Sequence, residues 1–366
     1  MVYVHIPFCK SFCTYCGFYS EICRNPGLFA GYTDLVCAEI DRRREEILAS
    51  GKVNTLYFGG GTPSVLPLDF IRRITKALPF DSHGYEEFTV EMNPDDVTDS
   101  LVAGLKDLGA NRISLGIQSF NDDILARMAR RHNADGAIRA AETIHRSGIQ
   151  ALSIDLIFGF PSLSDDIWVS TIETALKLHP EHISCYQLSI EEGSALEKMV
   201  AEGRFKEASQ EQCRRQYDYL CHTLAQAGYN HYEVSNFALP GHEAVHNGAY
   251  WSRAPYVGLG PGAHSFDGNA VRRWNSEFKA GSLGYDSSME ELSPRDIAVE
   301  KVMLGLRTSA GLPAKVLQEI TGSGAVQDAL SKGLLEPSDK THEEPWLRIP
   351  EDKFFVSDDI VSTLIP

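Results

Sequence analysis

Residues 2–16, VYVHIPFCKSFCTYC, decide the fold of this 366-residue chain. The stretch opens with an apolar, β-branched run at residues 2–6 that is typical of a buried strand. Three cysteines, Cys9, Cys13 and Cys16, follow in a segment whose proline and aromatic residues continue no regular pattern. We therefore expect a first strand that presents three thiols on a loop at its carboxyl end.

The spacing of the three cysteines points to a metal centre. The chain has only eight cysteines, too few for a disulfide scaffold, yet three of them fall within its first sixteen residues. Three thiolates can hold a 4Fe–4S cluster with one iron left free of protein ligands, because such clusters normally take four cysteines. The alternatives are a structural zinc site completed by His5 or Cys23, and buried free thiols. Zinc sites more often combine two separated cysteine pairs, which are absent here.

Strand and helix patterns alternate through the first half of the chain. The expected strands are residues 2–6, 55–58, 87–92, 112–116, 152–157 and 182–188, and the expected helices are residues 29–49, 67–78, 99–108, 134–147 and 164–178. Successive βα steps of this kind predict an α/β fold, a partial (β/α)6 version of the TIM-like barrel, with its site at the carboxyl ends of the strands. A closed eight-stranded barrel and an open doubly wound sheet are the competing interpretations.

The remaining chain suggests two further parts. Residues 1–195 form the expected partial barrel, and residues 196–282, with a helix at 207–227 and a Gly/Tyr/His-rich stretch after it, are an extension that completes the core. Residues 283–366 are expected to form a small, mostly helical C-terminal domain with helices at 294–306, 313–320 and 325–332 and a strand pair near Trp346 and Phe354. Its acidic stretch is read as a solvated surface or, alternatively, a docking face. The domain is a candidate lid or partner-docking module.

Charge and hydropathy exclude two classes of protein. With 34 Lys and Arg against 50 Asp and Glu, the formal net charge is −16, which argues against a nucleic-acid binder. The best apolar stretch, residues 151–160, is short and contains Asp155, so no membrane span is expected. The N-terminus lacks the pattern of a secretory signal, and we expect a cytoplasmic protein. Any peripheral membrane association would then come through acceptor proteins rather than through charge alone.

Polar residues recur near the ends of the expected strands. The glycine-rich GGGTP segment, with Gly60, Gly61 and Thr62, follows the second strand and lets the backbone approach a ligand closely. The other candidates are Glu91, Gln118, Arg130 and Asp155. Any one of them could be a cap or a surface group, but an aspartate inside an apolar strand is costly unless it has partners.

The pattern CxxxCxxC after the first strand of such a barrel resembles the radical S-adenosylmethionine (SAM) superfamily. The resemblance implies a 4Fe–4S cluster on Cys9, Cys13 and Cys16 whose open iron chelates SAM. It also implies an electron donor, because an electron from the cluster cleaves SAM to a 5′-deoxyadenosyl radical. The residues implied in SAM binding are Gly60, Gly61 and Thr62 near the methionyl end, Glu91 and Asp155 at polar groups of the methionyl or ribose, Gln118 and Arg130 as contributors, and Tyr3 and Tyr15 as weaker candidates.

Segments along nearly the whole chain are similar, in order, to the oxygen-independent coproporphyrinogen III oxidases and their relatives. They are YVHIPFC, LYFGGGTPS, NRISLGIQSF, HISCYQLSIEEGS, YEVSNFALPGHEAVHNGAYW and GLGPGAHSF. The true oxidases carry an N-terminal extension and a fourth cysteine two residues after the third. Here the first strand starts at once and Phe18 occupies that position, which resembles the haem-chaperone branch of the family.

A haem-binding residue is implied by the same branch. His246 lies in HNGAYW, which fits the HNxxYW pattern, and imidazole is a good axial ligand for haem iron. The alternative is a structural histidine beside two core aromatics. The main hypothesis is thus a haem chaperone that delivers haem to haem-requiring acceptor proteins, with respiratory proteins as one candidate. The alternative is a radical SAM enzyme that decarboxylates the propionates of coproporphyrinogen III. The sequence assigns no catalytic residue, and we expect no efficient oxidase activity.

Overall fold

The structure is a computed structural model that describes residues 1–23, 25–51, 54–279, 282–338 and 344–365. Its centre is a nine-stranded sheet in the order β11-β1-β4-β5-β6-β7-β8-β10-β9. The strands are β1 (Val2–Ile6), β4 (Thr55–Gly60), β5 (Glu87–Met92), β6 (Arg112–Gln118), β7 (Ala151–Phe158), β8 (His182–Gln187), β9 (Asn230–Glu233), β10 (Asn236–Ala238) and β11 (Val257–Leu259). From β11 to β8 all neighbours are parallel, which confirms the six expected strands and adds β11 at one edge.

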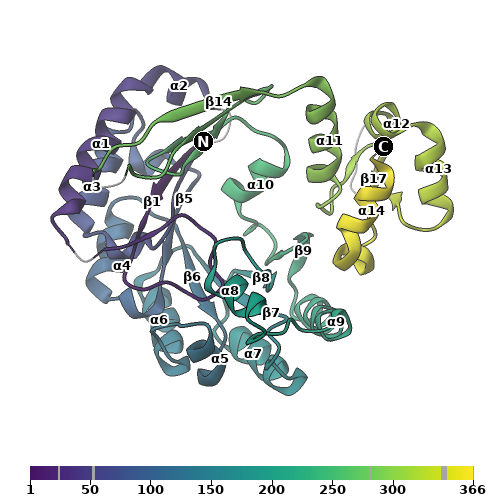
Figure 1. Cartoon of the computed structure of the whole chain (residues 1–366), viewed down its shortest axis with the longest axis horizontal. Coiled ribbons are helices and arrows are strands. Elements are labelled where there is room, and N and C mark those ends of the chain that lie inside the picture. The colour runs from purple at the N-terminus through teal and green to yellow at the C-terminus, as the bar shows by residue number, and fades with distance from the viewer. Residues whose placement is uncertain (24, 52–53, 280–281, 339–343, 366) are drawn as a thin grey trace.

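Helices cover the outer side of this sheet. They are α1 (Leu28–Arg42), α2 (Arg44–Ala49), α3 (Leu68–Ala77), α4 (Asp99–Asp107), α5 (Asp122–Arg127), α6 (Ala134–Ser147), α7 (Asp165–Lys177) and α9 (Gln210–Gln226). Two short helices lie elsewhere (Figure 1): α8 (Ala195–Ala201) is next to the cysteine loop, and α10 (Val245–Trp251) packs on the concave side of β4. Figure 1 shows α1, α3, α4, α6 and α7 following the outer side of the curved sheet in turn. Within the described chain β11 and β9 are the two edges of the sheet, so the fold is a partial barrel and not a closed one.

The strands alternate in a way that explains this arrangement. Val4, Phe58 and Val90 lie side by side in register and are fully buried. The flanking positions point to the opposite face, because successive side chains in a strand alternate. On that concave face lie polar residues such as Glu91 and Asp155, so the apolar face holds the helices and the polar face is left for a site.

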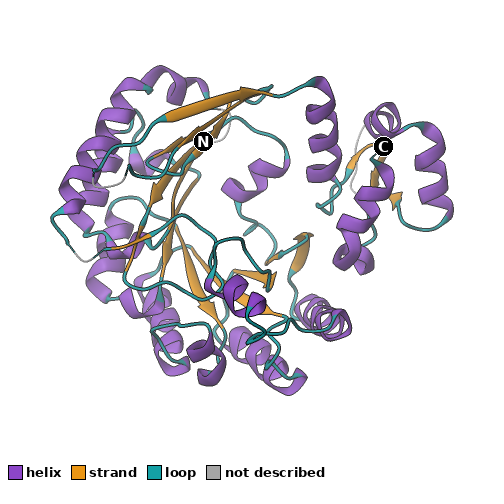
Figure 2. Cartoon of the chain, viewed as in Figure 1, coloured by secondary structure: helices purple, strands orange, loops and turns teal. Residues whose placement is uncertain are grey.

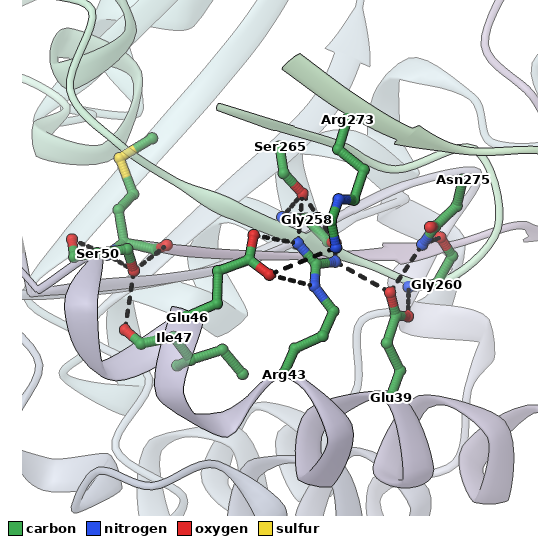
Figure 3. Close-up of polar contacts among 11 residues, drawn as sticks. Glu39, Arg43, Glu46, Ile47, Ser50, Gly258, Gly260, Ser265, Arg273 and Asn275 are labelled. Carbon is green, nitrogen blue, oxygen red and sulfur yellow. Dashed lines mark hydrogen bonds and ion pairs between the residues drawn. The ribbon is translucent and has the colours of Figure 1, made fainter. Parts of the chain in front are cut away.

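A second sheet lies next to β11, at one edge of the barrel sheet. It consists of β12 (His264–Phe266), β13 (Val271–Asn275) and β14 (Ser287–Glu291), all antiparallel. A buried polar network joins it and β11 to α1 (Figure 3). Arg43 donates to the Gly258 carbonyl at 2.7 Å and to the Ser265 hydroxyl at 2.9 Å, and Glu39 accepts from the Asn275 amide at 2.9 Å.

The C-terminal unit is mostly helical, as expected. It holds α11 (Pro294–Gly305), α12 (Ala314–Thr321), α13 (Ser323–Ser331) and α14 (Ser357–Leu364), with short strands β15 (Leu312–Pro313), β16 (Glu336–Pro337) and β17 (Trp346–Arg348). Figure 2 shows this unit as a helical body standing beside the barrel. The expected strand near Phe354 is wrong: Phe354 lies in a 3₁₀ turn, Glu351–Val356, and β17 pairs with β15 and β16 instead.

The contact between this unit and the barrel lies at β9. The buried Phe354 ring packs edge-on against His231, with ring centroids 5.0 Å apart. The division at residues 282 and 283 stays a prediction, although β14 pairs with β13 across it. No helix within the described ranges has both the length and the apolar character needed to cross a bilayer.

Candidate functional site

The three cysteines surround one turn at the carboxyl end of β1. Cys9 does not lie on the loop itself but in a two-residue strand, β2 (Phe8–Cys9), which pairs with β3 (Glu21–Ile22). The pairing closes the loop between them, where Cys13 and Cys16 are partly buried. Burial, with the nearby thiols Cys13 and Cys9, raises the pKa of Cys16 to about 11. Each thiolate raises the cost of ionising the next, as expected where thiols lie close together.

Arg130 connects this loop to the barrel. Its Nη1 donates to the Cys13 sulfur at 3.3 Å, and its Nη2 donates to Asn93 at 2.7 Å and to the Gly116 carbonyl. Its Nε is buried without a hydrogen-bond partner among the described residues. Burial lowers the pKa of Arg130, but Tyr15 and Cys13 raise it further, so the guanidinium stays charged. An unpaired buried donor beside a thiol is a position at which a ligand would be held.

The glycine-rich segment after β4 lies directly against the cysteine loop. The Thr62 hydroxyl is 3.3 Å from the Cys9 sulfur and accepts from the Asn93 amide at 3.3 Å. Gly60 has φ +111°, and a Cβ there would lie 2.7 Å from the ring of His5. A Cβ on Gly61 would lie 3.1 Å from the Cys9 sulfur. Only glycine permits this approach, so the segment is fitted to the cysteine site and is more than a turn.

Two carboxylates face each other on the concave side of the sheet. Burial raises the pKa of Glu91 to about 7, with the charge of Asp155 adding to it, while the Tyr57 hydroxyl donates to Glu91 at 2.7 Å. Burial also raises the pKa of Asp155 to about 6, although the hydroxyls of Ser184 and Ser114 partly oppose this. Both groups lack a cationic partner in direct contact among the described residues, so a ligand with ammonium, sulfonium or hydroxyl groups would stabilise their ionised forms.

Gln118 ends β6 in a strained conformation. Its φ is +71°, and the register of β6 against β7 shifts between Gly116 and Gln118. A Cβ on Gly116 would lie 3.1 Å from the Gln118 amide nitrogen and 3.4 Å from Arg130. Positive φ at a non-glycine residue costs of order 1–3 kcal/mol and clusters at ligand sites. The structure therefore brings Gln118 and Arg130 together.

The two tyrosines occupy different places. The Tyr3 hydroxyl is 3.1 Å from Nδ1 of His5, and burial followed by the charge of Glu91 raises its pKa. Tyr15 lies on the cysteine loop, where burial raises its pKa and Arg130 opposes that rise. Tyr3 is thus near the carboxylates and Tyr15 near the thiols, and no direct contact joins the two within the described chain.

The zinc alternative is not supported by these positions. Both candidates for a fourth zinc ligand, His5 and Cys23, are hydrogen-bonded elsewhere. Both ring nitrogens of His5 are taken, by Tyr3 and by the Tyr19 carbonyl at 3.0 Å. The Cys23 thiol donates to the Asn25 carbonyl at 3.5 Å. Three cysteine thiols beside the glycine-rich segment and Arg130 fit a multi-iron cluster with an adjoining ligand.

His246 is placed apart from the cysteine loop, at the amino ends of the strands. It is buried in α10, with Nδ1 2.8 Å from the Thr55 hydroxyl and Nε2 3.0 Å from the Tyr250 hydroxyl. Burial lowers its pKa to about 3. Both ring nitrogens are satisfied, which favours the structural alternative. Haem ligation by His246 stays a prediction, and it requires Tyr250 to move.

Four site residues escaped the sequence argument: Tyr57, Asn93, Ser114 and Ser184. Asn93 binds both Thr62 and Arg130 and so links the glycine-rich segment to the cysteine loop. The signal for it was present, because Asn93 stands two residues after Glu91 in EMNP. The two serines carried no such signal, since only the register of β6, β7 and β8 brings them to Asp155.

Comparison with known proteins shows the family of the chain. The Radical SAM superfamily matches residues 3–175. A protein of Synechocystis sp. called "Heme chaperone HemW" is 34% identical over 351 residues, which are 88% of this chain and 84% of that protein. The protein of the same name from Bacillus subtilis is 31% identical over 360 residues, with 92% and 93% covered.

This chain belongs to the HemW family.

Membership of that family, within the Radical SAM superfamily, supports a 4Fe–4S cluster and SAM as cofactors, in agreement with the residues described above. The fold of the HemW-family chain is also that of a solved structure. The coproporphyrinogen III oxidase HemN of Escherichia coli, described as a radical SAM enzyme, superposes with a TM-score of 0.80 at 21% identity, covering 99% of this chain and 89% of that one. At this identity the likeness concerns the fold alone.

Proposed function

We propose that this protein is a haem chaperone that holds a SAM-binding 4Fe–4S cluster and delivers haem to acceptor proteins. The observation that carries the proposal is the 34% identity to "Heme chaperone HemW" across 84% of that protein. The local sequence agrees, because the position of a fourth cysteine is taken by Phe18, a side chain that is 73% exposed. A phenyl ring cannot ligate iron, but it can contact a flat apolar ligand.

In this proposal Cys9, Cys13 and Cys16 hold the cluster, which supplies a one-electron route to bound SAM. Arg130 lies beside Cys13 and offsets the negative charge of the thiolates. Thr62 does the same for Cys9 by hydrogen bonding. An external electron donor is a further requirement of this arrangement.

The carboxylates and the strand ends are proposed to bind SAM. Gly60 and Gly61 place the backbone directly against His5 and Cys9, and the methionyl end is assigned to this segment. Glu91 and Asp155 lie where they can accept hydrogen bonds from ammonium or ribose hydroxyl groups, and a cationic ligand removes their mutual repulsion. Gln118 adds an amide beside Arg130, and Tyr3 and Tyr15 complete the walls.

The alternative function, oxidative decarboxylation of coproporphyrinogen III, is less well supported. The fold shared with HemN does not decide it, because one fold serves many activities. The curated relatives named above are called haem chaperones. The proposal includes respiratory haem proteins as acceptors. It also includes a cytoplasmic location, with membrane contact through those acceptors. The C-terminal unit is proposed to act as a lid or as a docking module.

The experiment that tests the proposal uses one anaerobically reconstituted preparation. Haem is titrated into it and followed by its absorption bands, and the same preparation is assayed for conversion of coproporphyrinogen to protoporphyrinogen. Stoichiometric haem binding with no turnover is expected. Steady turnover without haem binding would overturn the chaperone function and establish the enzyme alternative.

A further inference from the structure

A cavity adjoins the cysteine loop, and Tyr3 is the one residue assigned to SAM above that lines it. It has a volume of about 510 Å³, within the range of sites for small molecules and cofactors. Gly17, Phe18 and Tyr19, which directly follow Cys16, form one wall. A ligand in this cavity would therefore lie next to the cluster.

The other walls are aromatic and come from three separate parts of the chain. Tyr3 lies on β1, Tyr250 on α10, Tyr256 just before β11 and Trp274 on β13. Tyr250 and Tyr256 pack edge to face, with ring centroids 4.8 Å apart and an interplanar angle of 89°. Aromatic walls of this kind suit a flat, conjugated, largely apolar ligand, because they offer ring faces and edges to it.

One imidazole that lines this cavity has no hydrogen-bond partner among the residues that the structure describes. His264 is exposed, and neither of its ring nitrogens is hydrogen-bonded to any residue that the structure describes. His5, which also lines the cavity, and His246, behind Tyr250, have both ring nitrogens occupied. His264 thus differs from its neighbours in having a lone pair available at the cavity.

The position of His264 is firmly set by the second sheet. It stands directly opposite Trp274 in the β12–β13 pair, and the two rings are stacked at 22° with centroids 6.3 Å apart. Ser265, the next residue, is bound by Arg43 from α1 (Figure 3). A side chain on such a support can offer a ligand atom without first being ordered.

We infer that this cavity is the haem site of the protein and that His264 is the axial ligand of the haem iron. The inference rests on the proposed function, and it assigns the cargo to a different histidine from the one in the HNxxYW segment. Unlike His246, His264 requires no hydrogen bond to be broken before it ligates. Arg272 lies close to both His264 and Tyr256. Its charge adds to the lowering of the His264 pKa by burial, and it opposes the rise that burial causes in the pKa of Tyr256. The same charge favours an anionic edge such as the propionates. Glu277 lies on the cavity wall and Glu290 and Glu300 pair with Arg272, so the propionates would compete with these carboxylates.

The test compares the full-length reconstituted protein with His264→Ala and His264→Gly. The matched control is His222→Ala, an exposed histidine on α9, remote from the cavity. We expect wild type and control to show a histidine-ligated haem spectrum. Both His264 variants should shift the Soret band and lose haem to apomyoglobin at least about tenfold faster, since a factor of ten corresponds to about 1.4 kcal/mol. Adding imidazole to the glycine variant should restore the original spectrum.

Metal-free protoporphyrin separates iron ligation from packing. Its affinity should stay within about twofold in His264→Ala, because the iron contact is absent, but should fall in Trp274→Leu, which removes a cavity wall. If wild type binds haem and the His264 variants show unchanged spectra and release rates, the assignment is overturned while the chaperone function stands. If Trp274→Leu leaves protoporphyrin binding unchanged, the cavity is not the site. If wild type binds no haem, both proposals fail.

Discussion

Replacing Arg43 by leucine should weaken the attachment of the second sheet to the barrel (Figure 3). Arg43 is 8% exposed and makes its buried bonds to Glu39 at 3.0 Å, the Gly258 carbonyl at 2.7 Å and the Ser265 hydroxyl at 2.9 Å. Its bonds to Glu46 count for little, because that carboxylate is 40% exposed. Removing one partner of a buried ion pair costs about 3–5 kcal/mol.

The lower end of that range applies here. Without Arg43, Glu39 still accepts from the Gly260 N–H at 2.9 Å, the Asn275 amide at 2.9 Å and the Tyr285 hydroxyl at 2.7 Å, so it is not left bare. We therefore expect Arg43→Leu to lower the free energy of unfolding by about 3 kcal/mol.

Urea unfolding, monitored by far-ultraviolet circular dichroism, measures this loss. Wild type, Arg43→Leu and the control variant are compared either all with the cluster or all without it. The control is Arg44→Leu. The Arg44 side chain is 45% exposed, and it forms a long ion pair of 3.6 Å with the carboxylate of Asp41, which is also exposed. It should stay within about 0.5 kcal/mol of wild type. The reasoning that this network holds the sheet would be refuted if the free energies of unfolding of Arg43→Leu and the control differed by less than about 1 kcal/mol. The comparison requires that the dependence of the unfolding free energy on urea concentration be unchanged.

Four further predictions concern the cysteine site, the proposed SAM site and the C-terminal unit. Replacing Cys9, Cys13 and Cys16 together by alanine should remove the iron and acid-labile sulfide that reconstituted wild type contains, whereas Cys37→Ala should retain both; retention in the triple variant would contradict the cluster assignment. Asp155→Ala should weaken SAM binding, measured by calorimetry, by about 1.5–3 kcal/mol, the value of hydrogen bonds to a charged group. The pKa values of Glu91 and Asp155 are raised to about 7 and about 6, so both carboxylates become protonated as the pH falls. SAM affinity should therefore fall between about pH 8 and pH 5.5. An affinity that does not change with pH would exclude ionised carboxylates from the site. Deleting residues 293–366 should leave cluster content intact but impair haem transfer, and loss of the cluster would show that the C-terminal unit is part of the barrel's fold.

The sequence alone was sufficient for the repeating elements and for the cysteine motif. β1 and β5 begin and end at the expected residues, and α6 (Ala134–Ser147) matches its expected range, because strand and helix periodicity are local properties of the chain. Gly60 and Gly61 were singled out only together with the cysteine motif, since a run of glycines after a strand could equally be a turn.

Only the tertiary structure decided which side chains share a surface. Ser114 and Ser184 reach Asp155 because β6, β7 and β8 are adjacent and in register, and no local pattern encodes that adjacency. The same holds for the two histidines. The motif pointed to His246, but Thr55 on β4 and Tyr250 within the motif occupy its two ring nitrogens. His264 instead lines the cavity beside the cysteine loop, and no described residue is hydrogen-bonded to its ring nitrogens. Hydrogen-bond satisfaction depends on neighbours that are distant in the chain, so a sequence motif can name a histidine but cannot show whether its lone pair is free.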